Sequence, residues 1–303
     1  MVKYSTSKWF RGVGLTDLLV GLAIGLLAML VVLKMAVLFE ARRKSTVGTS
    51  DAQQNVSIAV SLMLRELRMA GQGLGSVESL ACAVSHDRGS SLGSLSLTPV
   101  TIIDGSAGAP DEITLFSSAS RQSTVPATLL EAHAASDTHM LIDSTLGIRP
   151  DDFLVFYEVG NPCTLVRATA LSTGSYRVDH STMPSSNSGT SATNSAQTSI
   201  AQNYAAGTQV INLGSLHLVR YSVDTNNDLQ VARYNASSNT WDSEGMSSGI
   251  VNLQAQYGFD TRSGLQTSPQ VTYWSSTMID ADGNGKTGDY GDIKRMIALR
   301  LIF

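Results

Sequence analysis

The sequence predicts an α+β protein: a long N-terminal helix, its first half membrane-spanning, followed by an antiparallel β-rich globular domain. Three observations lead to this prediction. An uncharged apolar run extends from Leu18 to Leu33, apolar residues then recur at three- and four-residue steps, and short β-type runs fill the remainder. We expect the helix at residues 13–71 and the globular domain at residues 72–303.

Composition bounds the class of protein before any motif is considered. Charged residues make up 15% of the 303 residues, and the formal net charge is −4. A nucleic-acid-binding protein usually shows a basic face or stripe, and none is evident here. We therefore expect an exported β-rich protein with no nucleic-acid partner.

The apolar run has the length of a membrane span. It resumes after Lys34, so that residues 18–39 would cover about 33 Å as a helix, close to the thickness of a hydrocarbon core. Lys3, Lys8 and Arg11 precede it, which predicts a cytoplasmic N-terminus and an exported C-terminal part. A cleaved secretory signal would need a shorter core and a small-x-small site. A plain signal anchor would leave the acid Asp17, at the start of the run, unexplained.

The segment from Arg11 to Val20, RGVGLTDLLV, resembles the prepilin cleavage motif of type IV pilins. In that family a short basic leader ends in Gly, and an acid stands five residues after the cut. The resemblance implies a leader at residues 1–12, cleavage by a prepilin peptidase between Gly12 and Val13, and Asp17 as the acid. The new amine of Val13 could then pair with Asp17 of a neighbouring helix inside an apolar filament core.

Two residues depart from the family pattern, which usually has Phe or Met after the cut and Glu as the acid. Here Val13 and Asp17 stand at those positions. The Asp side chain is one methylene shorter, so the pairing geometry is looser. Such departures suit a rare subunit better than the main building block.

The second half of the helix, residues 51–71, is predicted to be amphipathic and to pack on the globular domain. Its apolar stripe consists of Val56, Ala59, Val60, Met63, Leu67 and Ala70. Gly71, Gly73 and Gly75 then end the helix. Gly21 and Gly25, four residues apart in the apolar half, are a weaker candidate for close helix contact.

Within the pilins, the run LMLRELRMAG over residues 62–71 is similar to the PilW-type minor pilins, as are residues 253–260 and the closing strand at residues 296–303. The resemblance covers both ends of the chain, whereas residues 90–210 match only loosely. It implies a minor pilin that primes pilus assembly at the pilus tip. The implied partners are other minor and major pilins, the assembly platform and a tip adhesin. The alternatives are a J-type pseudopilin of a type II secretion system and an uncleaved signal-anchored envelope enzyme or binding protein.

One segment has the pattern of a calcium loop. Asp280, Asp282 and Asn284 alternate on a Gly-rich stretch, as in the first half of an EF-hand loop, and Ca²⁺ takes six to eight such oxygens. The bidentate Glu of the EF-hand is replaced by Gly291, and no flanking helices are expected. Asp289 or Asp292 could complete the ligand shell, with the Lys286 carbonyl contributing. The alternative is a plain surface turn. A bound Ca²⁺ would stiffen the loop rather than catalyse.

Cys82 and Cys163 are the only cysteines, and in an exported chain they favour one disulfide over two free thiols. An enzyme is not expected. The pattern G-x-S-x-G at residues 89–93 lacks the strand-turn-helix context of a nucleophile elbow. The five histidines show no metal-ligand spacing; they are His86, His133, His139, His180 and His217.

Overall fold

The computed structural model describes residues 14–74, 79–85, 92, 95–119, 125–181, 202–264 and 267–303. The chain divides into two compact units, Met1–Gln54 and Asn55–Phe303. The long helix α1 (Leu15–Met69) runs from the first unit into the second. The second unit thus contains the last turns of α1 together with the β-rich domain expected from residue 72. A long apolar helix and a β-rich domain with largely antiparallel sheets are the architecture that the sequence predicts.

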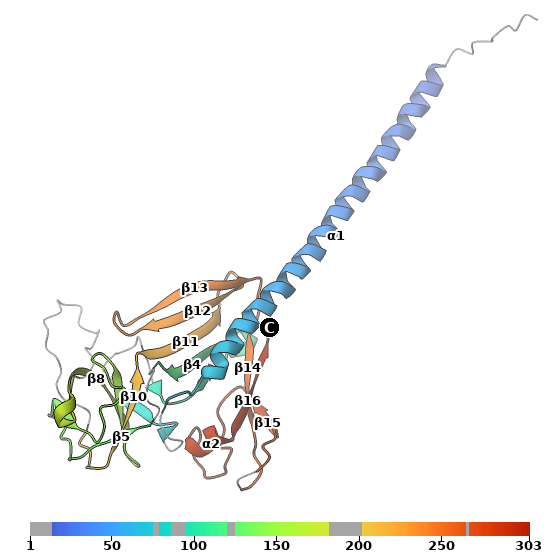
Figure 1. Ribbon diagram of the computed structural model, residues 1–303. Coiled ribbons are helices and arrows are strands. Elements are labelled where there is room, and N and C mark those ends of the chain that lie inside the picture. Colours follow the sequence, from blue (N-terminus) through green and yellow to red (C-terminus); the bar gives the residue numbers. More distant parts are fainter. Residues whose placement is uncertain are drawn as a thin grey trace, which may run out of the picture. The chain divides into compact units, whose positions relative to one another are not determined.

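The described strands of the second unit form three sheets, and Figure 1 labels most of these strands. The first sheet holds β1 (Ala83–Ser85), β2 (Leu95–Ser96), β5 (Ala127–Thr128), β6 (His139–Leu141), β7 (Phe153–Tyr157), β8 (Cys163–Ser172), β9 (Arg177–Ser181) and β10 (Gln209–Gly214). Its main path runs in the order β2-β1-β8-β7-β10-β5, and β9 joins β6 to β8. We call this the large sheet.

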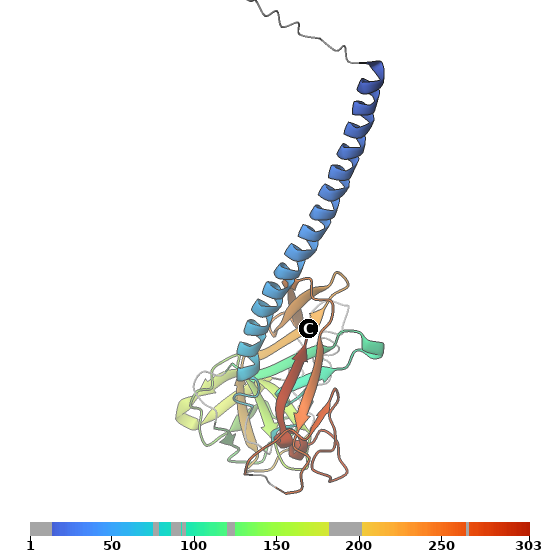
Figure 2. The same ribbon diagram turned by 90° about the vertical axis from the view of Figure 1, so that its right-hand side faces the viewer.

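The second sheet, the middle sheet, has the order β13-β12-β11-β4-β3. Its strands are β3 (Val100–Ile103), β4 (Glu112–Ser118), β11 (Leu216–Val223), β12 (Asp228–Asn235) and β13 (Thr240–Ser248). The C-terminal sheet has the order β15-β14-β16 and holds β14 (Gln254–Phe259), β15 (Tyr273–Ser275) and β16 (Met296–Ile302). Figure 2 shows β16, which leads to the C-terminus, beside β14. Short 3₁₀ turns occur at Ser106–Gly108 and Thr173–Ser175.

The last turns of α1 pack on the middle and C-terminal sheets. Ala59 and Met63 are fully buried there, and Val56, Leu67 and Ala70 pack against the same core cluster. Asn55 Nδ2 donates to the Ser248 carbonyl over 3.1 Å at the edge strand β13. Five of the six residues of the expected stripe therefore belong to this cluster or pack against it; the sixth, Val60, is partly buried.

Gly71 ends this helix because its φ of 81° lies in the left-handed region that favours glycine. Its N–H donates to the Phe116 carbonyl of β4 over 2.8 Å. A Cβ built at this position would lie 2.9 Å from Pro99 Cγ. Both the turn and the close approach of Pro99, just before β3, thus require glycine here.

Two further clusters bury both faces of the large sheet. On β7, Phe153 and Val155 lie in the cluster shared with the middle sheet, whereas Leu154 and Phe156 lie in the other. The apolar run FLVFY is therefore a strand that is buried on both sides.

The structure corrects two expectations about secondary structure and adds a polar strand that the sequence did not predict. A second helix, α2 (Tyr290–Arg295), directly follows the Asp-rich loop, where no flanking helix was expected. Strands β1 and β8 pair in parallel, in a domain expected to be antiparallel. The segment Thr240–Ser248 is polar and mostly exposed, yet it forms the strand β13. It does so because it hydrogen-bonds to β12, although it contains few apolar residues.

Candidate functional site

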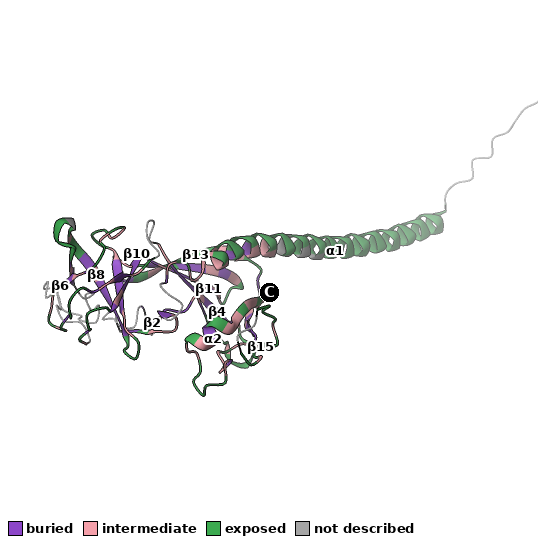
Figure 3. Ribbon diagram, turned by 60° about the horizontal axis from the view of Figure 1, so that its bottom comes forward, coloured by how far each residue is buried: buried purple, intermediate pink, exposed green. Residues whose placement is uncertain are grey.

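The first unit offers an exposed apolar helix surface. Every large apolar side chain from Leu15 to Phe39 in α1 is at least 54% exposed. Among the described residues, α1 is the one helix long and apolar enough to cross a membrane. Figure 3 shows the described residues of its apolar half as exposed, whereas buried residues appear at its C-terminal end. Such a surface is stable in a hydrocarbon environment or against other apolar helices.

Asp17 lies in the first turn of this helix and is exposed. Its backbone N–H donates to the Gly14 carbonyl over 3.0 Å, so the helix begins here. A carboxylate at this end of the helix interacts favourably with the positive end of the helix dipole. The expected cleavage point, Gly12–Val13, lies outside the described residues.

The Asp-rich loop between β15 and α2 is organised around Asp280. Its Oδ1 accepts hydrogen bonds from the N–H groups of Gly283 and Asn284 over 2.8 and 3.0 Å, and its Oδ2 accepts from Gly285 over 2.8 Å. The Gly285 N–H, with those of Gly283 and Asn284, holds the pKa of the Asp280 carboxyl below its ordinary value. The loop therefore keeps this carboxylate ionised.

Asp292 is the second organising carboxylate and is fully buried. Its Oδ1 accepts from the N–H groups of Ala281 and Asp282 over 2.6 and 3.2 Å, and its Oδ2 accepts from Gly288 over 2.7 Å. Asp289 caps α2, accepting from the Asp292 N–H over 3.2 Å. The short helix α2 thus directs the Asp292 carboxylate into the loop, and the Asp289 carboxylate caps its N-terminus.

Three carboxylates converge in this loop. One oxygen each from Asp280, Asp282 and Asp292 lies within 4.8 Å of the other two. None of the ion pairs among the described residues involves these groups. The cluster offers hard oxygen ligands of the kind that a divalent cation such as Ca²⁺ takes.

Asn284 and Lys286, the other predicted ligands of this loop besides Asp289, take part in hydrogen bonds within it. The amide nitrogen of Asn284 donates to Asp282 Oδ2 and Asp289 Oδ2 over 3.1 and 2.7 Å, so Asn284 bridges two carboxylates. The Lys286 N–H donates to Asn284 Oδ1 over 2.8 Å. Asp292, which sequence reasoning offered only as an alternative to Asp289, lies in the converging set. The N-cap pattern Asp289-x-x-Asp292 is the local signal that could have assigned the two roles.

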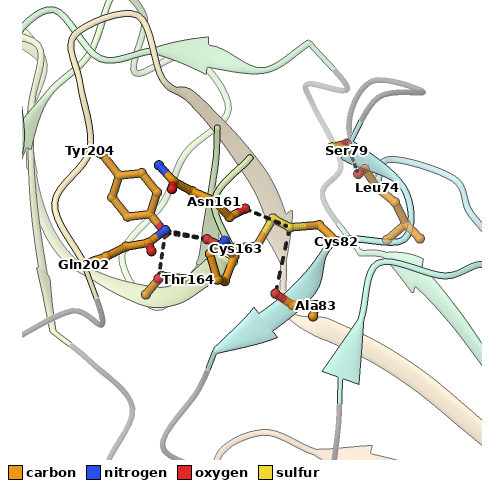
Figure 4. The surroundings of a disulfide bond; sticks show 10 residues. Leu74, Ser79, Cys82, Ala83, Asn161, Cys163, Thr164, Gln202 and Tyr204 are labelled. Carbon is orange, nitrogen blue, oxygen red and sulfur yellow. Dashed lines mark hydrogen bonds between the residues drawn. A yellow bond between two sulfur atoms is a disulfide. The ribbon is translucent and has the colours of Figure 1, made fainter. Parts of the chain in front are cut away.

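Cys82 and Cys163 form a disulfide with a Cα–Cα distance of 5.9 Å, which joins β8 to the segment just before β1 (Figure 4). The neighbouring Tyr204 hydroxyl donates to Thr164 Oγ1 or the Pro162 carbonyl, at 2.7 and 3.0 Å. The bridge therefore fastens the segment after α1 to the large sheet.

The G-x-S-x-G pattern lies outside the described residues except for Leu92, which is buried. No protein-family model, curated protein or solved structure matches this chain. The case for a function therefore depends on the residues and their geometry.

Proposed function

We propose that this chain is a PilW-type minor pilin of a type IV pilus. In this proposal a prepilin peptidase removes residues 1–12 from an inner-membrane precursor whose C-terminal domain is periplasmic. The apolar half of α1 then moves from the membrane into the core of the filament. The proposed partners are other minor and major pilins, the assembly platform and a tip adhesin.

The observation that carries the proposal is Asp17, in the first turn of a helix that exposes apolar side chains on all sides. An isolated carboxylate at an apolar segment is costly and calls for a cationic partner. The free amine of Val13 on a neighbouring subunit would be that cation. Transfer of the apolar half of α1 from the membrane to the filament core costs little free energy, because one apolar environment replaces another.

Intact mass of the protein from sheared filaments, combined with N-terminal sequencing, tests the proposal. We expect a chain that starts at Val13 and carries a methylated amine. A Gly12→Val variant should stay uncut, whereas the matched Gly14→Val variant should still be cut. A chain that starts at Met1 in cells with an active prepilin peptidase would overturn the proposal in favour of a signal-anchored envelope protein.

Asp17 can be tested separately from cleavage. The Asp17→Asn variant should be cut normally but should be strongly depleted from sheared filaments, and Asp17→Glu should restore assembly. Equal incorporation of Asp17→Asn and the unchanged protein would exclude the proposed pairing.

We further propose that the converging carboxylates of Asp280, Asp282 and Asp292 hold a structural Ca²⁺, with Asn284, Lys286 and Asp289 completing or bracing the loop. The ion would tie the loop to α2 and hence to the start of β16. Ca²⁺ should raise the melting temperature of the full-length protein in detergent, and Asp280→Asn should abolish the rise. The control Asp228→Asn, on β12, should keep it. No Ca²⁺-dependent shift in the unchanged protein would exclude the ion.

A further inference from the structure

Two histidines that lie 47 positions apart in the sequence meet in the large sheet. His133 precedes β6, and His180 belongs to β9. Their Nε2 atoms are 2.8 Å apart, and the side chains are only 3% and 4% exposed. Phe156 of β7 contacts both rings, with centroid separations of 5.1 and 6.0 Å, and Tyr204 stacks on Phe156 at 5.0 Å. One aromatic ring, that of Phe156, thus contacts both imidazoles.

The hydrogen bond between the two rings requires that at least one of them be neutral and accept at Nε2. One Nε2 must carry a proton and the other must accept it, since each neutral imidazole has one donor and one acceptor. Each Nδ1 is buried without a hydrogen-bond partner among the described residues. A proton added to the donor ring would sit on its buried, unpartnered Nδ1, which keeps the Nε2 contact but places a charge in an apolar site. A proton added to the acceptor ring at Nε2 would also turn the contact into two opposed donors.

The charged groups near the pair offer limited compensation. Asp137 lies in the same turn as His133 and accepts from the Ala134 N–H over 2.8 Å. On β9, Asp179 is paired with Arg177 at 2.7 Å. His139 of β6 lies close enough to oppose a further positive charge. Burial, followed by His133 itself, lowers the pKa of His180 to about 4, and burial also lowers the pKa of His133.

The pair also joins separate segments of the chain. The backbones of His133 and Tyr204 exchange two hydrogen bonds of 2.9 Å, and the His180 N–H donates to the Thr138 carbonyl over 2.9 Å. The ring contact therefore joins the segment before β6 to β9, and the backbone hydrogen bonds of His133 join the same segment to the one before β10. These segments cover one of the clusters that bury the large sheet, including Met140, Val178 and Val210.

We propose that the His133–His180 pair is an acid-sensitive latch, closed while both rings are neutral and opened by protonation. Opening would release β6, β9 and the segment at residues 202–208, and would leave the middle sheet intact. The predicted response is a local, reversible loosening of one part of the domain in acidic surroundings.

The direction of the pH effect follows from the lowered pKa values. The unfolded chain protonates these histidines as the pH falls through 6.5, whereas the folded chain resists until much lower pH. Stability is therefore fully present above pH 6.5 and is lost as the pH falls towards 4. Between pH 7.5 and pH 5 the ratio of folded to unfolded protein should drop by roughly an order of magnitude or more because of this pair.

Thermal unfolding of the full-length chain in detergent micelles at pH 7.5 and pH 5.0 tests the latch. The unchanged protein and the control His139→Gln, whose side chain is exposed, should lose melting temperature on acidification. The double variant His133→Gln/His180→Gln should lose clearly less. An equal loss in the double variant and in the unchanged protein would overturn the proposal.

Hydrogen exchange on the unchanged protein tests the latch without any substitution. After correction for the intrinsic effect of pH on exchange, acid should increase exchange in peptides covering residues 129–142, 177–181 and 202–208. Peptides from β4 and β11 should remain protected. Increased exchange that is uniform, or that begins in the middle sheet, would overturn the proposal.

Discussion

The two halves of α1 share one helical backbone but bury their side chains differently. From Leu15 to Phe39 the large apolar residues surround the helix and are all exposed, whereas in the second unit Ala59 and Met63 are buried and Leu62 and Leu64 are exposed. The comparison shows that the apolar content of a helix predicts where it must contact lipid or other apolar side chains. The spacing of its apolar residues predicts how much of its surface that contact covers. The first half needs a partner on all sides, and the second needs one on a single face.

The largest expected effect is in the first half. A double change of Leu27→Arg and Leu30→Arg places two charges near the centre of the apolar run, at a cost of about 5 kcal/mol or more for membrane insertion. We expect the protein to become extractable from membranes with alkaline carbonate. The matched pair Leu27→Val and Leu30→Val should remain in the membrane. Retention of the arginine variant would mean that this half is not a membrane span.

In the second half, Met63→Ala removes a fully buried side chain from the core between α1 and the middle and C-terminal sheets. We expect a loss of about 2–4 kcal/mol in the free energy of unfolding, measured with urea. The adjacent Leu64→Ala, at a side chain that is 43% exposed, should cost much less. Equal losses would contradict the one-sided burial of this half.

Gly71→Ala tests the end of the helix. The left-handed φ and the nearby Pro99 ring should together cost about 1–2 kcal/mol in the free energy of unfolding. Gly48→Ala is the control, because a Cβ there meets no atom within 4 Å. The control should leave the unfolding of the second unit unchanged, and a neutral Gly71→Ala would show that the chain can end the helix in another way.

The smallest expected effect concerns Glu66, whose Oε2 lies 3.2 Å from His217 Nε2 of β11. The pair is partly exposed, so we expect a coupling energy below about 1 kcal/mol. A double-mutant cycle with Glu66→Gln and His217→Gln measures it. A much larger value would mean that polar contacts, rather than the apolar stripe, hold α1 on the sheet.

Sequence reasoning located the elements with strong local patterns. Two of the β-type runs, at Phe153–Tyr157 and Leu216–Val223, form β7 and β11. It missed the polar strand β13 and the short strands β1 and β2, because their pairing depends on neighbours far away in the chain rather than on their own composition. It also missed α2, whose six residues are too few to show a helical period.

In the candidate calcium loop, too, the local sequence pattern predicted some of the converging residues and offered another only as an alternative. The alternation of Asp280, Asp282 and Asn284 predicts converging oxygens, and two of these residues do converge with Asp292. Asp292 joins them because α2 turns its carboxylate inward, where it accepts three backbone hydrogen bonds. The His133–His180 contact has no sequence signal at all, since no fixed spacing joins β9 to the segment before β6.

By itself the sequence determined the long helix, its change from all-round to one-sided apolar surface and most long strands, because these depend on periodicity within about a dozen residues. Only the tertiary structure decided which faces meet: the parallel pairing of β1 with β8, the inward place of Asp292 and the contact of two histidines. Such contacts form between segments far apart in the chain. Their geometry depends on how the sheets pack rather than on any local spacing.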